Sequence, residues 1–379
     1  GYDITLANSA NDFGGLLSLQ RANDIVLADT NGLALSGRAT GADADMTVTA
    51  GGALILSDGV ATTGNMTLTA GGVSFGGTVV EGNLTVQSSG ADIIQRQKTV
   101  DGAQVDTILR VAGTTDLTAA NVVLDHVNAF DGAVLLTTTG NVQLGAEGAI
   151  EFGASTIGGD LTATTVKGMT QSGAVAVTGA TRLTTEYDAD ILLSSAGNDF
   201  GGLVSVVYGR DAVIADASAL SITGTTLRNL TATAGGALSV GAMTVGQNLS
   251  LAGASITDTG ADILAVDGNT TVAATGAITL DNLHQFGGTV GVTSGSDLNL
   301  RDTNALELSG VDITGALTLR VDGAITQSAG SSVLVDGAAD IATTGGADVT
   351  LSGAGIDLSC GLSLGATGAV SVTDANALS

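Results

Sequence analysis

Residues 3–37 read "DITLANSANDFGGLLSLQRANDIVLADTNGLALSG", and residues 190–224 read "DILLSSAGNDFGGLVSVVYGRDAVIADASALSITG". Both stretches contain the five residues NDFGG, at 11–15 and at 198–202. Around them, apolar residues alternate with polar ones, and Gly, Asn and Asp separate the alternating runs. Alternation with a period of two, interrupted by turn residues, is typical of short half-buried strands. The stretch therefore predicts an all-β structure.

The same pattern recurs in three degenerate copies. Long repeats therefore start near residues 3, 121, 190, 277 and 348. Repetition of this kind indicates an architecture in which each unit packs on the next. We expect residues 1–379 to form a single continuous β-solenoid segment of a longer protein.

A shorter step runs inside the long repeats, at intervals of roughly 20 residues. It connects apolar residues at equivalent places, namely Leu6, Leu27, Val48, Leu68 and Val86, then Leu193, Ile214, Ala232 and Leu251, then Leu280, Leu300 and Leu319. A strand that returns at this interval, with two other strands between returns, predicts a three-sided parallel β-helix. The phase of the coils is not defined within residues 88–115 and 253–270.

Recurring four-residue phrases predict how each coil is built. "NMTL" starts at 65, "NLTV" at 83, "NLTA" at 229 and "NLSL" at 248. We expect Asn or Asp at a corner, Met or Leu pointing inward, and Thr or Ser pointing outward. In NDFGG, we expect the Phe to fill the interior beside a corner, while the two Gly adopt positive φ and let neighbouring coils approach closely.

Composition excludes several classes of protein. The chain has 57 Gly, no Pro, no Trp and only 2% aromatic residues, and its 37 acidic against 11 basic residues give a net charge of −26. Such a surface repels nucleic acid and anionic membranes, so neither is expected as a partner. No apolar run approaches the roughly 18 residues of a membrane span. A single Cys excludes an internal disulfide framework.

The phrases GNLTV (82–86), TAGGAL (49–54 and 233–238), GAITQSAG (323–330) and NDFGG resemble a known family. They are similar to the β-strand repeats of filamentous haemagglutinin-like adhesins, large exoproteins of two-partner secretion in Gram-negative bacteria. The resemblance implies a right-handed parallel β-helix, export to the bacterial outer-membrane surface or medium, and a role in adhesion, aggregation or biofilm. The family's N-terminal secretion domain and C-terminal anchoring region are not recognised, so we expect an internal segment.

These observations favour a non-catalytic extracellular rod segment that acts as a rigid spacer in adhesion and cell aggregation. One alternative is a filament- or sheath-forming protein assembled by contacts between rods, and another is a carbohydrate-binding β-helix. Partners would be cell-surface or matrix glycans or proteins, bound through regions outside this segment, with self-association possible. An enzyme is not expected, because β-helical polysaccharide lyases and hydrolases need clustered acids or an Arg or Lys base, and usually aromatic sugar platforms. We predict no catalytic, cofactor-binding or metal-binding residue.

Several residues nevertheless invite a functional interpretation. His126 and His284 lie about eight coils apart, too far to share a metal at ~4.8 Å per coil, and are expected to be loop histidines without a role. Four aspartates precede a Leu by four residues and could bind calcium, but their separation favours turn capping; they are Asp29, Asp216, Asp302 and Asp374.

Three further features have a structural interpretation beside a functional one. Five Asn begin N-x-[ST] glycosylation sequons that the repeat generates by itself, namely Asn65, Asn83, Asn229, Asn248 and Asn269. Outward threonines could form an ice-binding ladder but also suit any exposed strand; they are Thr47, Thr49, Thr67, Thr69 and Thr85. Cys360 is expected to be a small hydrophobe near a corner, with an intermolecular disulfide as the alternative.

Overall fold

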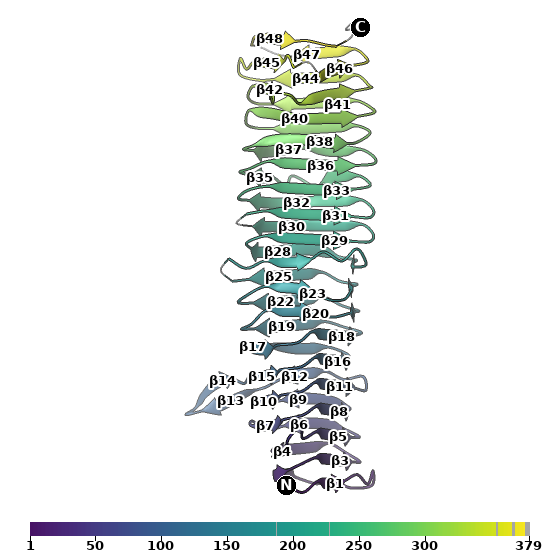
Figure 1. Cartoon of the computed structure of the whole chain (residues 1–379), viewed down its shortest axis with the longest axis vertical. Coiled ribbons are helices and arrows are strands. Elements are labelled where there is room, and N and C mark those ends of the chain that lie inside the picture. Colours follow the sequence, from purple (N-terminus) through teal and green to yellow (C-terminus); the bar gives the residue numbers. More distant parts are fainter. Residues whose placement is uncertain (187, 227, 354, 366–367, 376–379) are drawn as a thin grey trace. The chain divides into compact units, whose positions relative to one another are not determined.

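The computed structural model describes residues 1–186, 188–226, 228–353, 355–365 and 368–375. In these residues all regular structure is β-strand, and the strands stack in parallel as a β-solenoid, which confirms the predicted fold class. The chain divides into two compact units, Gly1–Asp190 and Ile191–Ser379. Figure 1 shows the coils of each unit. That the whole chain is one continuous segment stays a prediction.

The step of roughly 20 residues separates the residues that pair with each other on neighbouring coils of one wall in each unit. In unit 1 this wall contains β1 (Ile4–Leu6), β3 (Ile25–Asp29), β5 (Met46–Ala50), β8 (Met66–Ala70), β11 (Leu84–Ser88) and β16 (Thr115–Ala119). Leu6 pairs with Leu27, Leu27 with Val48, Val48 with Leu68, and Leu68 with Val86. In unit 2 the equivalent wall contains β26 (Ile191–Leu193), β29 (Ala212–Asp216), β31 (Leu230–Ala234) and β33 (Leu249–Gly253). Leu193 pairs with Ile214, Ile214 with Ala232, and Ala232 with Leu251. The predicted correspondence of these residues is confirmed.

The core is a column of aliphatic side chains inside each stack of coils. Leu27, Val48 and Leu68 are buried, whereas Thr47 and Thr67 on the same strands face solvent. Burial of one such side chain stabilises the fold by about 1.5–3 kcal/mol. Four of the few aromatic residues belong to this core: Phe75, Phe152, Phe200 and Phe286 are among the largest fully buried side chains.

Each coil supplies more than one wall, because a long strand in one coil faces two short strands in the next. In unit 1, β4 (Leu33–Ala39) pairs with β6 (Ala53–Leu56) through its first half and with β7 (Val60–Thr62) through its second. In unit 2, β37 (Ile278–Phe286) pairs in the same way with β34 (Ile256–Asp258) and β35 (Leu264–Val266). Some coils therefore have three short strands, and in others one long strand takes the place of two short ones.

One antiparallel hairpin interrupts the stack in unit 1. It consists of β13 (Gln97–Val100) and β14 (Ala103–Asp106), and it stands out from the wall in Figure 1. Asp101 and Gly102 form its tip with φ of 50° and 83°, the left-handed pair that a two-residue hairpin turn requires. The insertion explains the undefined phase of residues 88–115, since Asn83 meets Thr114 of the next coil only 31 residues later.

The glycines of NDFGG do not have the predicted conformation. Gly14, Gly15, Gly287 and Gly288 all lie outside the positive-φ region. Close approach between coils holds for one copy, because a Cβ on Gly288 would lie 2.5 Å from the backbone of Gly268. Around Gly14 and Gly15 nothing lies within 4 Å of such a Cβ. Where a preceding coil is present, these glycines therefore allow its backbone to approach closely. They do not form a turn.

Candidate functional site

The four aspartates selected from the sequence bind backbone amides. Asp216 is 3% exposed; its Oδ2 accepts a hydrogen bond from the amide of Phe200 at 2.6 Å, and its Oδ1 accepts one from the amide of Ser218 at 2.6 Å. Asp29 binds the amides of Phe13 and Asn31 in the same way, at 2.7 and 2.8 Å. The capping of the residue two positions later was predicted, and the bond to the Phe sixteen residues earlier was not.

The third and fourth copies follow the same plan with differences. Asp302 is fully buried, and its Oδ1 alone accepts from the amides of Phe286 and Asn304, at 3.3 and 3.1 Å. Its Oδ2 is buried without a hydrogen-bond partner in the described residues, and burial raises the pKa of Asp302 above its usual value. Asp374 Oδ1 accepts from the amide of Leu358 at 3.3 Å.

A second recurring position lies two residues before the Phe. Asn198 occupies it in one copy and donates through Nδ2 to the carbonyls of Leu193 and Ala215, at 3.1 and 3.2 Å. Asn128 occupies it before Phe130, and His284 before Phe286. All three side chains are fully buried. His284 is therefore equivalent to Asn128 and not, as the sequence suggested, to His126.

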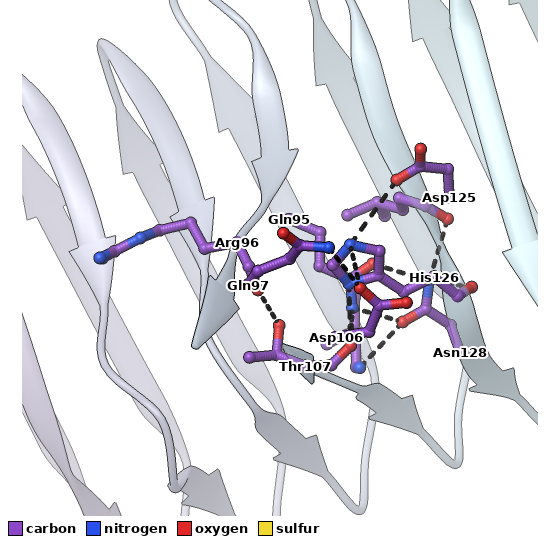
Figure 2. A network of polar contacts seen from close by, with 10 residues as sticks. Gln95, Arg96, Gln97, Asp106, Thr107, Asp125, His126 and Asn128 are labelled. Carbon is purple, nitrogen blue, oxygen red and sulfur yellow. Dashed lines mark hydrogen bonds and ion pairs between the residues drawn. The ribbon is translucent and has the colours of Figure 1, made fainter. Parts of the chain in front are cut away.

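Figure 2 shows the polar network at the root of the hairpin, where Gln95 and Asn128 exchange amide hydrogen bonds. Gln95 Nε2 donates to Asn128 Oδ1 at 2.7 Å, and Asn128 Nδ2 donates to Gln95 Oε1 at 3.0 Å. Asn128 Oδ1 also accepts from the amide of Leu109, at 2.9 Å, just after the hairpin. Gln95 Nε2 bonds the carbonyl of Thr107 at 2.8 Å, and the Thr107 hydroxyl bonds the carbonyl of Arg96. Both arms of the hairpin are thereby fixed to the wall.

His126 lies at the edge of this network in β17 (Val122–Phe130), so its prediction as a loop residue was wrong. Its Nδ1 is 3.1 Å from the carbonyl oxygen of Thr107, which can only accept, so Nδ1 is the donor in that contact. Its Nε2 lies 3.4 Å from Asp106 Oδ1, and its side chain is 11% exposed. The imidazole thus connects the wall to the last residue of the hairpin.

His284 was also predicted to be a loop residue and is instead a fully buried residue of β37. Its Nδ1 accepts a hydrogen bond from the amide of Leu264 at 3.1 Å, and its Nε2 is 3.0 Å from Asp258 Oδ2. Since an amide can only donate, Nδ1 carries no proton and the neutral ring donates through Nε2. Burial lowers the pKa of His284, against the opposing effect of the Asp258 carboxylate.

The two polar pairs occupy equivalent places in units 1 and 2. β12 (Ile93–Gln95) and β34 both pair with the first half of a nine-residue strand, and Gln95 and Asp258 end them. Leu109 and Leu264 begin the next short strands, β15 (Leu109–Val111) and β35. The segment between them is 96–108 in unit 1 and 259–263 in unit 2. The Gln95–Asn128 amide pair at the base of a long hairpin thus corresponds to the Asp258–His284 carboxylate–imidazole pair at the base of a short turn.

The sequon asparagines form hydrogen-bonded ladders along the corners. In unit 2, Asn229 Oδ1 accepts from the amide and the side chain of Asn248, at 3.2 and 3.0 Å. Asn248 Oδ1 accepts from the amide of Asn269, whose Oδ1 accepts from the amide of Thr289, both at 3.0 Å. Asn65 and Asn83 continue an equivalent ladder in unit 1. The predicted stacking of these corners is confirmed, and it gives each Asn a structural role.

The threonine ladder exists but is short. Thr47, Thr67 and Thr85 are in register on neighbouring coils, and Thr49 pairs with Thr69. The row of Thr47, Thr67 and Thr85 ends there, because Val26 pairs with Thr47 on one adjoining coil and Asp116 pairs with Thr85 on the other. Cys360 lies in a bend between Leu358 and Leu362, near a corner as predicted, and its side chain is exposed.

A depression on the surface of unit 1 has mixed charge. It measures about 450 Å³, and Glu81, Arg110, Asp131, Glu147 and Lys167 contribute its charged groups. Arg110 and Glu147 form an exposed ion pair at 3.0 Å. An exposed ion pair such as Arg110–Glu147 contributes little to stability. A smaller depression, of about 270 Å³, lies beside the hairpin root.

The described residues contain no group of three or more His, Cys, Asp or Glu side chains placed to hold a metal ion. Within the same residues, no helix is long and apolar enough to span a membrane.

Comparison with protein families gave a match over most of the chain. The family DUF5649, described as repeats of unknown function, matches residues 63–137, 139–207, 227–293 and 295–365. The chain belongs to this family. Each DUF5649 repeat spans ~70 residues and so covers several coils. The step that sets the strand pairing is shorter, because it is a single coil. No curated protein and no solved structure matched the chain.

Proposed function

We propose that this chain is a non-catalytic spacer within an extracellular adhesin or biofilm matrix protein of Gram-negative bacteria. The observation that carries the proposal is the use of its buried polar groups. Asp29, Asp216, Asn128 and Asn198 all bind backbone groups that hold coils and corners together. Polar side chains committed to the backbone leave little for recognition or chemistry, and the net charge of −26 keeps the exposed walls soluble.

The proposal is tested by removing whole coils from the full-length protein. Deleting residues 46–65 joins Asp45 to Met66 in register, because Met46 pairs with Met66. Deleting residues 230–248 does the same in unit 2, because Leu230 pairs with Leu249. If the chain is a spacer, both deletions preserve folding, secretion and adhesion and only shorten the reach of distal regions, seen by electron microscopy of the cell surface. Loss of adhesion from one folded deletion would contradict the proposal.

Assembly of filaments or sheaths is the second candidate, and the β13–β14 hairpin favours it. All ten of its residues, 97–106, are exposed, including Val100 at 43% and Val105 at 40%. In the described residues each strand pairs only with the other, which leaves two open strand edges. Unpaired edges are templates for pairing with another chain.

Replacing residues 96–108 by TGADI, the sequence at 259–263, removes the hairpin and keeps the native connection of the equivalent coil. If the hairpin mediates assembly, sedimentation velocity shows oligomers for the wild-type chain and monomers for the replacement. A monomeric wild-type chain across protein concentration and salt would exclude this candidate and leave the spacer.

A further inference from the structure

The buried Asp258–His284 pair closes a corner of unit 2 by a single imidazole. His284 Nδ1 accepts from the amide of Leu264, the first residue of β35. His284 Nε2 donates to Asp258 Oδ2, which also accepts from the amide of Asn282 at 2.9 Å. The side chains of His284 and Asp258 are 0% and 5% exposed. The two ends of the turn 259–263 are therefore joined through the ring.

This geometry requires a neutral ring. A protonated imidazole has two N–H donors and no acceptor. Protonation at Nδ1 would place a donor against the donor amide of Leu264 and leave that buried amide without a partner, which destabilises the closed turn. The bond to Asp258 would persist, so the damage falls on the Leu264 side of the turn.

We propose that the Asp258–His284 pair is a pH-sensitive latch, which holds the turn 259–263 against the wall at neutral pH and releases it in mild acid. At the equivalent corner of unit 1, Gln95 and Asn128 make the corresponding bonds with amides that do not titrate. His126 lies beside that pair and contacts Thr107 and Asp106, but it makes none of these closing bonds. The two units thus carry a titratable and a non-titratable form of the same closure.

The charged groups around the ring are acidic. Asp258 lies on β34, Asp281 on the same strand as His284, and Asp302 pairs with His284 from β39 (Leu298–Asp302). Asp262 lies in the turn and accepts from the Thr259 hydroxyl at 3.1 Å. Arg301 is next to Asp302 in the chain, but it belongs to the outward-facing positions of β39 and pairs with Arg320 on the neighbouring coil. These carboxylates favour protonation, whereas burial opposes it and dominates.

The direction of the effect follows from linkage. Burial sets the pKa of folded His284 below its ordinary value of 6.5. The open form then binds more protons than the closed form, so the closed form loses stability as pH falls below about 6.5 and through the folded pKa. Asp302 acts in the opposite sense, since burial raises its pKa and its neutral form favours the fold. Its contribution is removed by Asp302→Asn.

Hydrogen–deuterium exchange of peptides covering residues 256–266 tests the latch between pH 8 and pH 5. After correction for intrinsic exchange, we expect protection to fall by up to about tenfold per pH unit below 6.5, as one bound proton requires. The fall should persist in Asp302→Asn. The double variant Asp258→Gln/His284→Asn, which carries the pair of unit 1, should show constant protection. An unchanged slope in the double variant, or constant protection in the wild type, would overturn the proposal.

Two further measurements protect the test against a variant that fails to fold. In a His126→Asn background, which removes the imidazole beside Asp106 and Thr107, the reciprocal change Gln95→Asp/Asn128→His should make residues 93–111 more acid-sensitive than the background variant. Nuclear magnetic resonance of the wild-type chain follows His284 directly, because the chain has only two His and His126→Asn assigns them. The latch requires that His284 titrate below pH 6.5 and that the Leu264 amide shift with it. Titration at or above that value, or an amide that does not respond, contradicts the latch.

Discussion

Asp216 and Phe200 are joined by a 2.6 Å hydrogen bond from the backbone amide of the Phe to the carboxylate, across sixteen residues of chain. Asp29 and Phe13 repeat it at 2.7 Å, and Asp302 and Phe286 at 3.3 Å. The bond fixes the backbone at a position where the Phe side chain enters the core. The recurrence of NDFGG and of the later Asp in the sequence thus has one cause, because the two motifs bind each other.

The difference between Asp216 and Asp302 predicts responses of different size to the same substitution. In Asp216→Asn one carboxylate oxygen becomes an NH₂ group facing a backbone amide, so we expect a loss of about 1–3 kcal/mol in the free energy of unfolding. In Asp302→Asn the new NH₂ can replace the unpartnered Oδ2, and a buried charge disappears. We expect Asp302→Asn to be less destabilising in chemical denaturation at pH 7.

The pH dependence separates the two variants further. Burial raises the pKa of Asp302, so the wild-type chain loses stability as pH rises from about 4 through that raised pKa. Asp302→Asn removes this loss, and its stability relative to wild type should improve from pH 4 to pH 8. A relative stability of Asp302→Asn that is constant with pH would show that the buried carboxylate is not penalised.

Gly288→Ala should destabilise the chain, whereas Gly15→Ala should not. A Cβ at position 288 would lie 2.5 Å from the Gly268 backbone, so neighbouring coils must separate. Around position 15 there is open space and an ordinary φ. We expect a loss of about 1–3 kcal/mol for the first change and none for the second, measured by thermal unfolding. Equal effects would mean that coil spacing adapts freely.

The asparagine ladder predicts a small and directional effect. Asn248→Ala removes the acceptor of the Asn269 amide and the donor to Asn229, and should cost about 0.5–1.5 kcal/mol because the site is exposed. Ser250→Ala, at an outward position of the same strand, is the matched control. Exchange of the Asn269 amide should accelerate in the first variant alone. Acceleration in both would assign the effect to the strand and not to the ladder.

The period of the sequence defined the register because a solenoid repeats one local pattern. Leu27, Val48 and Leu68 are buried for the same reason, and they pair with one another and with Leu6 in the predicted order. The fates of single polar residues were not predictable, since burial of Asp302 or His284 depends on which strand lies across the coil. The NDFGG glycines were misjudged because a Gly pair fits both a turn and a close contact.

The hairpin had a signal that was not used. Residues 97–106 read QKTVDGAQVD, in which Asp-Gly separates two strand-like runs, a strong short-range indication of a two-residue hairpin. The interruption of the coil period over the same residues points to an insertion. Its anchoring through Gln95 and Asn128 could not be inferred, because these residues lie 33 positions apart.

Asn128 should control the order of the hairpin from below. Its side chain bonds the amide of Leu109, the carbonyl of Leu124 at 2.9 Å, and both polar atoms of the Gln95 amide. Asn128→Ala removes the acceptor of the buried Leu109 amide and the donor to Gln95 Oε1, whereas Gln95 Nε2 keeps its bond to Thr107. We expect a loss of about 2–4 kcal/mol together with faster proteolysis within residues 97–106. Gln104→Ala removes only the exposed bond to Thr99 at 3.1 Å near the tip and should leave cleavage at the wild-type rate. If limited proteolysis cleaves both variants equally, the hairpin is held by its own strands and not by the network at its root.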